Sequence, residues 1–102
     1  MLFNLGVFHK EDITYSVKAS SHSLDRMKEY DISRKVVFNT VKELPAKALK
    51  QYSNDEIAIL NFNQNISVIA FVPAKTNKIR IITVINKYNI WTKKDTKIEK
   101  LY

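Results

Sequence analysis

The stretch SSHSLDRMKEYDIS, residues 20–33, places His22 and Arg26 one helical turn apart. Its two leading serines can accept hydrogen bonds from backbone N–H groups, which predicts a helix that begins there and runs to Tyr30. In the first turn of a helix, free N–H groups and the helix dipole favour an anion such as phosphate. An imidazole and a guanidinium at this spacing could therefore bind a phosphate and move a proton beside it.

The predicted helix has one polar and one apolar face. At about 100° per residue, His22, Asp25, Arg26 and Glu29 share one face, and Leu24 and Met27 lie opposite. We expect the helix to pack through the apolar pair and to turn its histidine and arginine outward or toward the lip of a sheet. The same pattern fits an ordinary solvated face, on which Arg26 is paired with Asp25 or Glu29.

Composition narrows the kinds of chemistry open to the chain. Its 102 residues predict one domain, residues 1–102. Cysteine is absent, which excludes disulfides, thiol catalysis and thiolate metal sites. The two histidines, His9 and His22, do not have metal-ligand spacing, so we expect no metal site and no cofactor.

The longest uncharged apolar run, Ile66 to Ala74, is far shorter than the ~20 residues that cross a bilayer. The N-terminus has no basic leader and reads as a strand. We therefore expect no membrane partner and a cytoplasmic location, in a bacterium or a host cell. Abundant lysine, asparagine and isoleucine are typical of AT-rich coding sequence, as in a phage, a plasmid or a low-GC bacterium.

Positive charge is concentrated near the C-terminus. The net charge is +7, and residues 75–102 hold eight of the seventeen basic residues but only two acids. Such a balance favours a polyanionic partner, and the aromatic rings among the lysines of the basic C-terminal segment, residues 87–102, favour RNA or another single-stranded nucleic acid. The expected contacts are Lys78, Lys87, Trp91, Lys93, Lys94 and Lys97. The alternative is a solvated tail that keeps the protein in solution.

The first half of the chain predicts a hairpin followed by two helices. Leu2–Phe8 and Ile13–Ala19 are strand candidates. After the first helix, Ser33 or Asp31 can cap a second one, which Pro45 ends or redirects. The residues that follow, 46–55, fit either a helical turn or a loop.

The second half changes to a strand pattern. Glu56–Asn63, Ile66–Pro73 and Lys78–Asn86 are rich in β-branched residues and are separated by the turn signals QN and AKTN, which predicts a three-stranded antiparallel meander. The third strand has Ile79, Ile81 and Ile85 on one face and Ile82 and Val84 on the other, which is typical of a central strand. The tail after Asn86 could add a short strand and a terminal helical turn. The predicted fold is α+β, with two helices packed on an antiparallel sheet of four to five strands.

HSLDRMKEYDIS resembles the signature His-(Ala/Ser)-Leu-x-Arg-Met-x-x-(Arg)-Gly-Ile-Ser, which opens small domains related to the BrnT and RelE toxins and to the nuclease tips of some colicins and contact-dependent inhibition toxins. In those families a helical pair precedes an antiparallel meander whose last long strand is similar to KIRIITVI, residues 78–85. The resemblance covers about residues 13–86. The Arg-Gly pair of the signature is Tyr30-Asp31 here.

The resemblance implies a RelE-like, metal-independent ribonuclease toxin that acts on mRNA or tRNA and is held by an antitoxin or immunity protein. His22 would be the base or acid, and Arg26 and Arg80 the cations that stabilise charge on the phosphorane. Further donors would come from Lys78, Thr83 and Tyr88. Three of these also have a structural interpretation: Arg80 as a solvent-facing strand residue, Thr83 as a strand residue in the sheet, and Tyr88 as an aromatic ring at the edge of the core.

A second interpretation is a non-catalytic phage or plasmid protein on the same scaffold. It would bind a host protein or nucleic acid through the basic C-terminal surface. The missing Arg-Gly pair and the single candidate histidine favour it.

Overall fold

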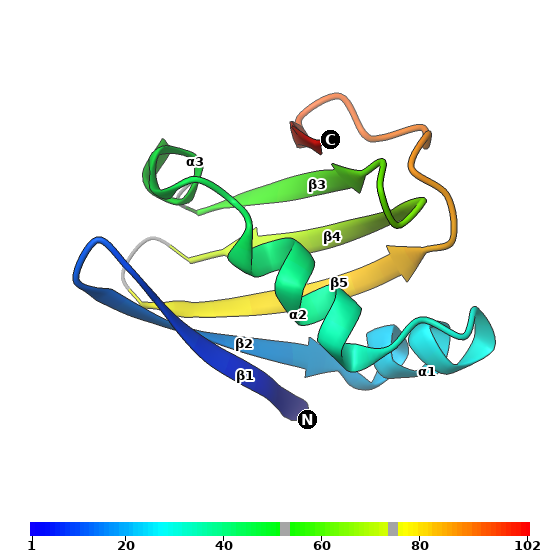
Figure 1. Ribbon diagram of the computed structural model, residues 1–102, viewed down its shortest axis with the longest axis horizontal. Coiled ribbons are helices and arrows are strands. Elements are labelled where there is room, and N and C mark those ends of the chain that lie inside the picture. The colour runs from blue at the N-terminus through cyan, green and yellow to red at the C-terminus, as the bar shows by residue number, and fades with distance from the viewer. Residues whose placement is uncertain (52–53, 74–75) are drawn as a thin grey trace.

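A computed structural model describes residues 1–51, 54–73 and 76–102 (Figure 1). Within these residues, six strands form one mixed sheet and three helices accompany it. In chain order the elements are β1 (Leu2–Lys10), β2 (Ile13–Ser20), α1 (Ser21–Glu29), α2 (Arg34–Lys42), α3 (Ala46–Gln51), β3 (Asp55–Asn61), β4 (Ile66–Val72), β5 (Lys78–Ile85) and β6 (Lys97–Leu101).

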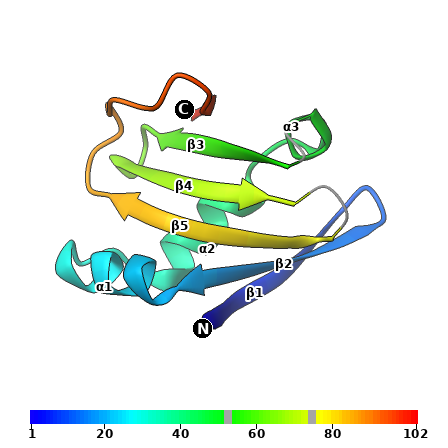
Figure 2. The same ribbon diagram turned by 180° about the vertical axis from the view of Figure 1, so that it is seen from behind.

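The strands lie in the order β1-β2-β5-β4-β3-β6. Neighbours are antiparallel except for β2 with β5 and β3 with β6, which are parallel. Both α1 and α2 contact the sheet, and α2 crosses in front of it in Figure 1. Seen from behind in Figure 2, α2 lies beyond the strands, and we call this second side of the sheet the open face.

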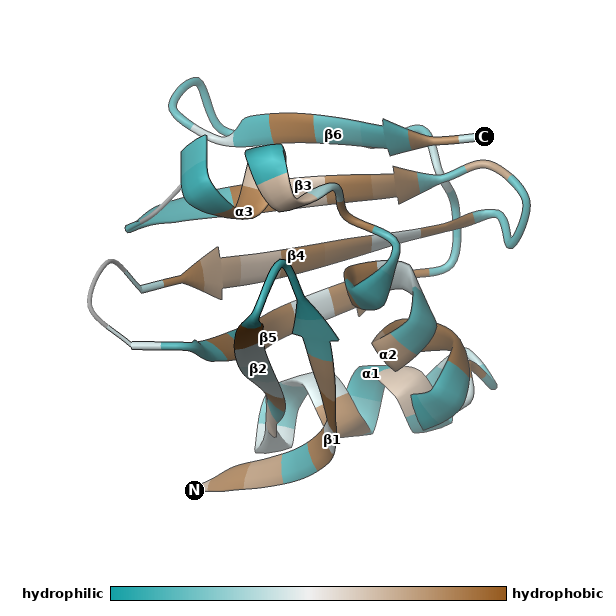
Figure 3. Ribbon diagram, turned by 60° about the vertical axis from the view of Figure 1, so that its left-hand side comes forward, coloured by the Kyte–Doolittle hydropathy of each residue, from teal (hydrophilic) through white to brown (hydrophobic). Residues whose placement is uncertain are grey.

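The core lies between the helices and the sheet. It is built from alternate strand residues and from the apolar faces of α1 and α2, and Figure 3 shows the apolar character of β3 and β4. Its fully buried members include Val17, Val37, Val41, Ile57, Ile59, Val68, Ile79, Ile81 and Val84. Met27 of α1 is buried and Leu24 is packed against the core, as the helical spacing predicted.

Sequence reasoning placed most elements correctly. The fold class is α+β, the hairpin joins β1 to β2, and β3, β4 and β5 form the predicted antiparallel meander. Both helix starts are confirmed: the hydroxyl of Ser20 accepts from the backbone N–H of Ser23, and that of Ser33 accepts from the N–H of Val36 at 3.1 Å. These hydroxyls satisfy N–H groups that would otherwise have no partner in the helix.

The size of the sheet was predicted wrongly. It has six strands, where four to five were expected, and it is mixed because two of its pairs are parallel. The expected terminal helical turn is absent: residues 97–101 form β6, which pairs with the outer edge of β3 and satisfies the backbone groups exposed there. Among the described residues there is also a third helix, α3, which follows Pro45 and buries Leu49. The predicted loop or turn at 46–55 and the turn at 74–77 fall partly on residues 52, 53, 74 and 75, outside the described residues.

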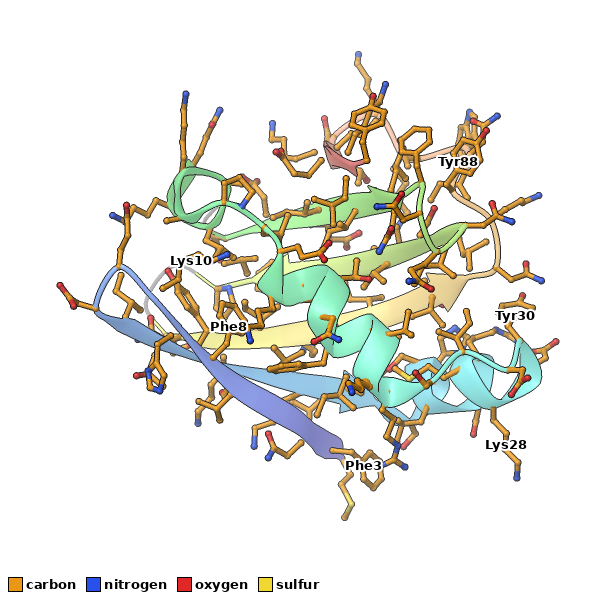
Figure 4. All side chains as sticks on the ribbon, in the orientation of Figure 1. Phe3, Phe8, Lys10, Lys28, Tyr30 and Tyr88 are labelled. Atoms are coloured by element: carbon orange, nitrogen blue, oxygen red, sulfur yellow. The ribbon has the colours of Figure 1, made fainter. Side chains whose placement is uncertain are left out.

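The first strand is fastened to α2 at two points. Phe8 packs edge-on against Phe38 of α2, with the ring centroids 6.1 Å apart. Two residues further along β1, the ammonium group of Lys10 donates hydrogen bonds to the backbone carbonyls of Lys42, the last residue of α2, and of Leu44, which follows the helix (Figure 4). Partial burial, followed by the charge of Lys42, lowers the pKa of Lys10 below its usual value.

The cap of α2 gives a first testable prediction. Ser33→Ala removes the side-chain acceptor of the Val36 N–H, and we expect it to lower the free energy of unfolding by about 1 kcal/mol. Urea unfolding measures this loss. As a control, Ser21→Ala changes an exposed serine inside α1 and should change stability by less than half as much; equal losses in the two variants would contradict the capping role.

Candidate active site

A shallow hollow on the open face contains the histidine that the sequence singled out. We call it the His22 hollow, and its volume is about 620 Å³. It lies where β2 runs into α1, so the ends of two strands and the start of a helix form its walls. Its lining residues are Met1, Leu2, Ser20, Ser21, His22, Glu56, Arg80, Ile81 and Ile82. His22 and Arg80, which are far apart in the sequence, therefore meet in one cavity.

A bulge in β5 places the Thr83 side chain next to His22. Ile69 is paired with Thr83 and the next residue of β4, Ala70, with Ile81, so Ile82 is an extra residue in β5. This bulge reverses the alternation, which places Thr83 on the open face and Val84 in the core. Thr83 Oγ1 lies 3.4 Å from His22 Nε2. The predicted faces of β5 were wrong beyond the bulge for this reason.

Arg80 is held by an aromatic ring on the neighbouring strand. Its guanidinium carbon lies 5.6 Å from the centre of the Phe71 ring, directly across the β4–β5 pair. On its other side, Lys18 of β2 is its partner in the parallel register. The hollow thus has a positively charged wall whose arginine is exposed to solvent and kept in place by stacking.

The same hollow contains a carboxylate that sequence reasoning missed. Glu56 at the start of β3 is half-buried and lies in one cross-strand row with Phe71 and Arg80. One strand separates β3 from β5, so the two backbones are about 10 Å apart. The signal in the sequence was weak: Glu56 follows Asp55 at the start of a strand whose centre is apolar, and nothing in its spacing links it to His22.

Arg26, which was predicted to be catalytic, forms an ion pair on α1. It is not part of the lining of the His22 hollow, and its guanidinium is paired with Glu29 one turn further along α1. The hydrogen bond to that carboxylate, with the attraction between the two charges, raises the pKa of Arg26 above its usual value. This is the solvated helix face that was the alternative interpretation, and Arg26 is 40% exposed.

Tyr88 also lies outside the hollow. Its ring is 4.3 Å from that of Phe62, which in turn stacks on Tyr102 at 4.6 Å. Figure 4 shows Tyr88 above the end of β5, whereas Lys28 of α1 lies below it. Tyr88 is therefore part of an exposed aromatic cluster with Phe62 and Tyr102. Lys78 lies at the start of β5, exposed and on the same face as Arg80.

The predicted nucleic-acid contacts of the C-terminal segment do not gather in one place. Trp91 and Lys93 line a second hollow on the open face, the Trp91 slot, while Lys87 and Lys94 are exposed outside it. Lys97 is level with the buried Ile57 and so lies on the helix side of β6. The slot is lined by Glu56, Ile69, Ile82, Thr83, Ile85, Ile90, Trp91, Thr92, Lys93 and Thr96.

The described part of the chain has neither a metal-binding cluster nor a membrane-spanning helix. Residues 1–51, 54–73 and 76–102 contain no cluster of three His, Asp or Glu side chains that could hold a metal ion. Over the same part of the chain, none of the helices has the length and apolar character needed to span a bilayer. No protein-family model, curated protein or solved structure matches the chain.

Proposed function

We propose that this chain is a ribonuclease toxin that cleaves mRNA or tRNA without a metal, with the His22 hollow as its active site. The observation that carries the proposal is the convergence of an imidazole, a carboxylate and an exposed guanidinium, from His22, Glu56 and Arg80, in one cavity. The resemblance of residues 22–33 to the toxin signature supports it. An antitoxin or immunity protein would be the natural partner of such an enzyme.

Cleavage through a 2′-hydroxyl needs one group to take a proton and another to give one. His22 and Glu56 supply these two groups. One of them removes the 2′-hydroxyl proton as O2′ attacks phosphorus, and the other protonates the leaving O5′ as the P–O5′ bond breaks. The products are a 2′,3′-cyclic phosphate and a 5′-hydroxyl end.

Arg80 would stabilise the pentacovalent phosphorane. Its guanidinium can donate two parallel hydrogen bonds to phosphate oxygens, and its stacking on Phe71 limits the conformational freedom lost on binding. Thr83 contacts His22 Nε2 and would orient the imidazole, so we regard it as a positioning residue. Arg26, which is paired with Glu29, is given no catalytic role.

The test is incubation of the purified protein with total bacterial RNA in EDTA, followed by mapping of new 5′-hydroxyl ends. We expect discrete cleavage by the wild type and a loss of about 10²–10³-fold in rate for Arg80→Gln, the cost of removing one donor that stabilises a developing oxyanion. Arg34→Gln is the matched control, because Arg34 is an exposed arginine at the first turn of α2. Equal activity in both variants would exclude Arg80 from the reaction.

A non-catalytic nucleic-acid binder is the second candidate. It is favoured by the exposure of Lys87, Lys93 and Lys94 along the segment that joins β5 to β6. Binding would weaken as salt increases, because each phosphate contact releases counterions. Intact RNA together with a salt-sensitive gel shift that His22→Ala does not change would favour this function over the ribonuclease.

A further inference from the structure

The Trp91 slot adjoins the His22 hollow directly. Glu56 and Ile82 line both cavities, and Thr83 in the slot lies 3.4 Å from His22 in the hollow. The extra residue of the β5 bulge, Ile82, therefore forms part of the wall between them. A ligand that reaches the His22 hollow has the slot as its immediate neighbour.

The slot has the size and the lining of a site for one flat ring. Its volume is about 200 Å³, below the ~300–1,000 Å³ of sites that enclose drug-sized ligands. Isoleucines from β4, β5 and the following segment, Ile69, Ile85 and Ile90, form apolar walls. Besides Trp91 and Ile82, the rest of the lining is polar: Thr83, Thr92, Thr96, Lys93 and Glu56 can donate or accept hydrogen bonds at the polar edges of a ring.

Trp91 is the unusual member of this lining. It is 89% exposed, although an indole is among the side chains that gain most from burial. It is also the only tryptophan in the chain, and basic residues follow it at positions 93 and 94. An exposed indole beside positive charge has the chemistry that stacks an unpaired base while lysines neutralise the adjoining phosphates.

We propose that the Trp91 slot binds one unstacked nucleobase of a single-stranded RNA whose adjacent phosphate occupies the His22 hollow. This inference rests on the proposed function for the identity of the ligand, and it goes beyond it by assigning a base-binding subsite and a preference for single strands. A base within a duplex is stacked on both faces and paired, so it cannot enter the slot. Structured RNA would be cleaved only in loops and at ends.

The single tryptophan makes the inference directly measurable. The probe is a 2′-O-methylated single-stranded oligoribonucleotide, which has no 2′-hydroxyl nucleophile and therefore binds without being cleaved. We expect it to quench the fluorescence of Trp91. Two control probes should leave the fluorescence nearly unchanged. One is an abasic chain of equal length, and the other is the same oligonucleotide annealed to its complement as a duplex.

Variants test the same contact by binding. With a labelled oligonucleotide, Trp91→Ala should raise Kd by about 5- to 150-fold, the range of one base–aromatic stack, and Trp91→Phe should recover part of the loss because a ring remains. Tyr102→Ala is the matched control: Tyr102 is an exposed ring in the same segment, but it stacks on Phe62. Since Trp91 is so exposed, its replacement should leave the melting temperature unchanged.

The results separate the two proposals. If bases quench the fluorescence but the protein leaves RNA intact, the result would support base binding in the Trp91 slot and exclude ribonuclease activity. If the protein cleaves RNA but shows no quenching, or if wild type and Trp91→Ala bind with equal affinity, the result would support ribonuclease activity and contradict base binding in the Trp91 slot. Equal quenching by the abasic chain, or no binding of any oligonucleotide, would also overturn it.

Discussion

His22→Ala is expected to slow RNA cleavage in EDTA by about 10²–10⁴-fold, the contribution of a positioned general acid or base, without lowering the melting temperature. The imidazole is exposed, and its recorded contact within the protein is with Thr83 Oγ1. Removing it therefore takes away the proposed proton-transfer group while the packing of α1 through Met27 is retained. The measurements are the rate of appearance of new RNA ends and a thermal unfolding curve.

The chain contains its own control for this experiment. His9, the other histidine, is also exposed, and it forms a hydrogen bond of 2.8 Å with Thr14 on the hairpin. It is not part of the lining of the His22 hollow. His9→Ala should cleave RNA at the wild-type rate; equal loss in both variants, or unfolding of His22→Ala, would contradict a catalytic role for His22.

The largest expected effect on stability comes from Gly6→Ala. Gly6 follows a bulge in β1 and has a φ of 156°, and a Cβ added to it would lie 2.6 Å from the Phe38 ring of α2. Backbone strain and the overlap together should lower the free energy of unfolding by about 2–4 kcal/mol. At about 4–8 °C per kcal/mol for a domain of this size, the melting temperature should fall by 8 °C or more.

A double-mutant cycle identifies the source of that loss. In a Phe38→Ala background the ring is gone, so Gly6→Ala should cost only the backbone strain, and the two changes should be less than additive. Asn4→Ala, at an exposed position on the same strand, should change stability by less than about 0.5 kcal/mol. Strict additivity of the Gly6 and Phe38 changes would exclude the contact as the cause.

Local signals made most of the fold predictable. Serine caps marked the starts of both main helices, and β-branched runs separated by turn residues marked the meander. The parallel pairs were not predictable in this way, because they join strands that are distant in the sequence. A short strand in the tail was allowed for, and β6 confirms it, but its parallel pairing with the free edge of β3 was not predictable from its weak local pattern.

The site was less predictable than the fold. His22 and Arg80 were identified by residue type, but the spacing that suggested Arg26 equally fitted the ion pair with Glu29 that the structure contains. Thr83 reaches the histidine only because a bulge reverses which face of the sheet the side chains of β5 point to. No local sequence pattern predicted that bulge. Glu56 joins the hollow through the order of the strands, which is a property of the whole sheet.

The parallel pairing of β2 with β5 also determines when the His22 hollow can be completed during synthesis of the chain. The hairpin and α1 leave the ribosome first, but the strand that lies between β2 and β4 is made only after residue 77. His22 is therefore present early, and the wall that contains Arg80 arrives late. A nascent chain stopped before β5 would lack the β5 residues that line the hollow, and it would also lack the strand that joins β2 to β4 in the sheet.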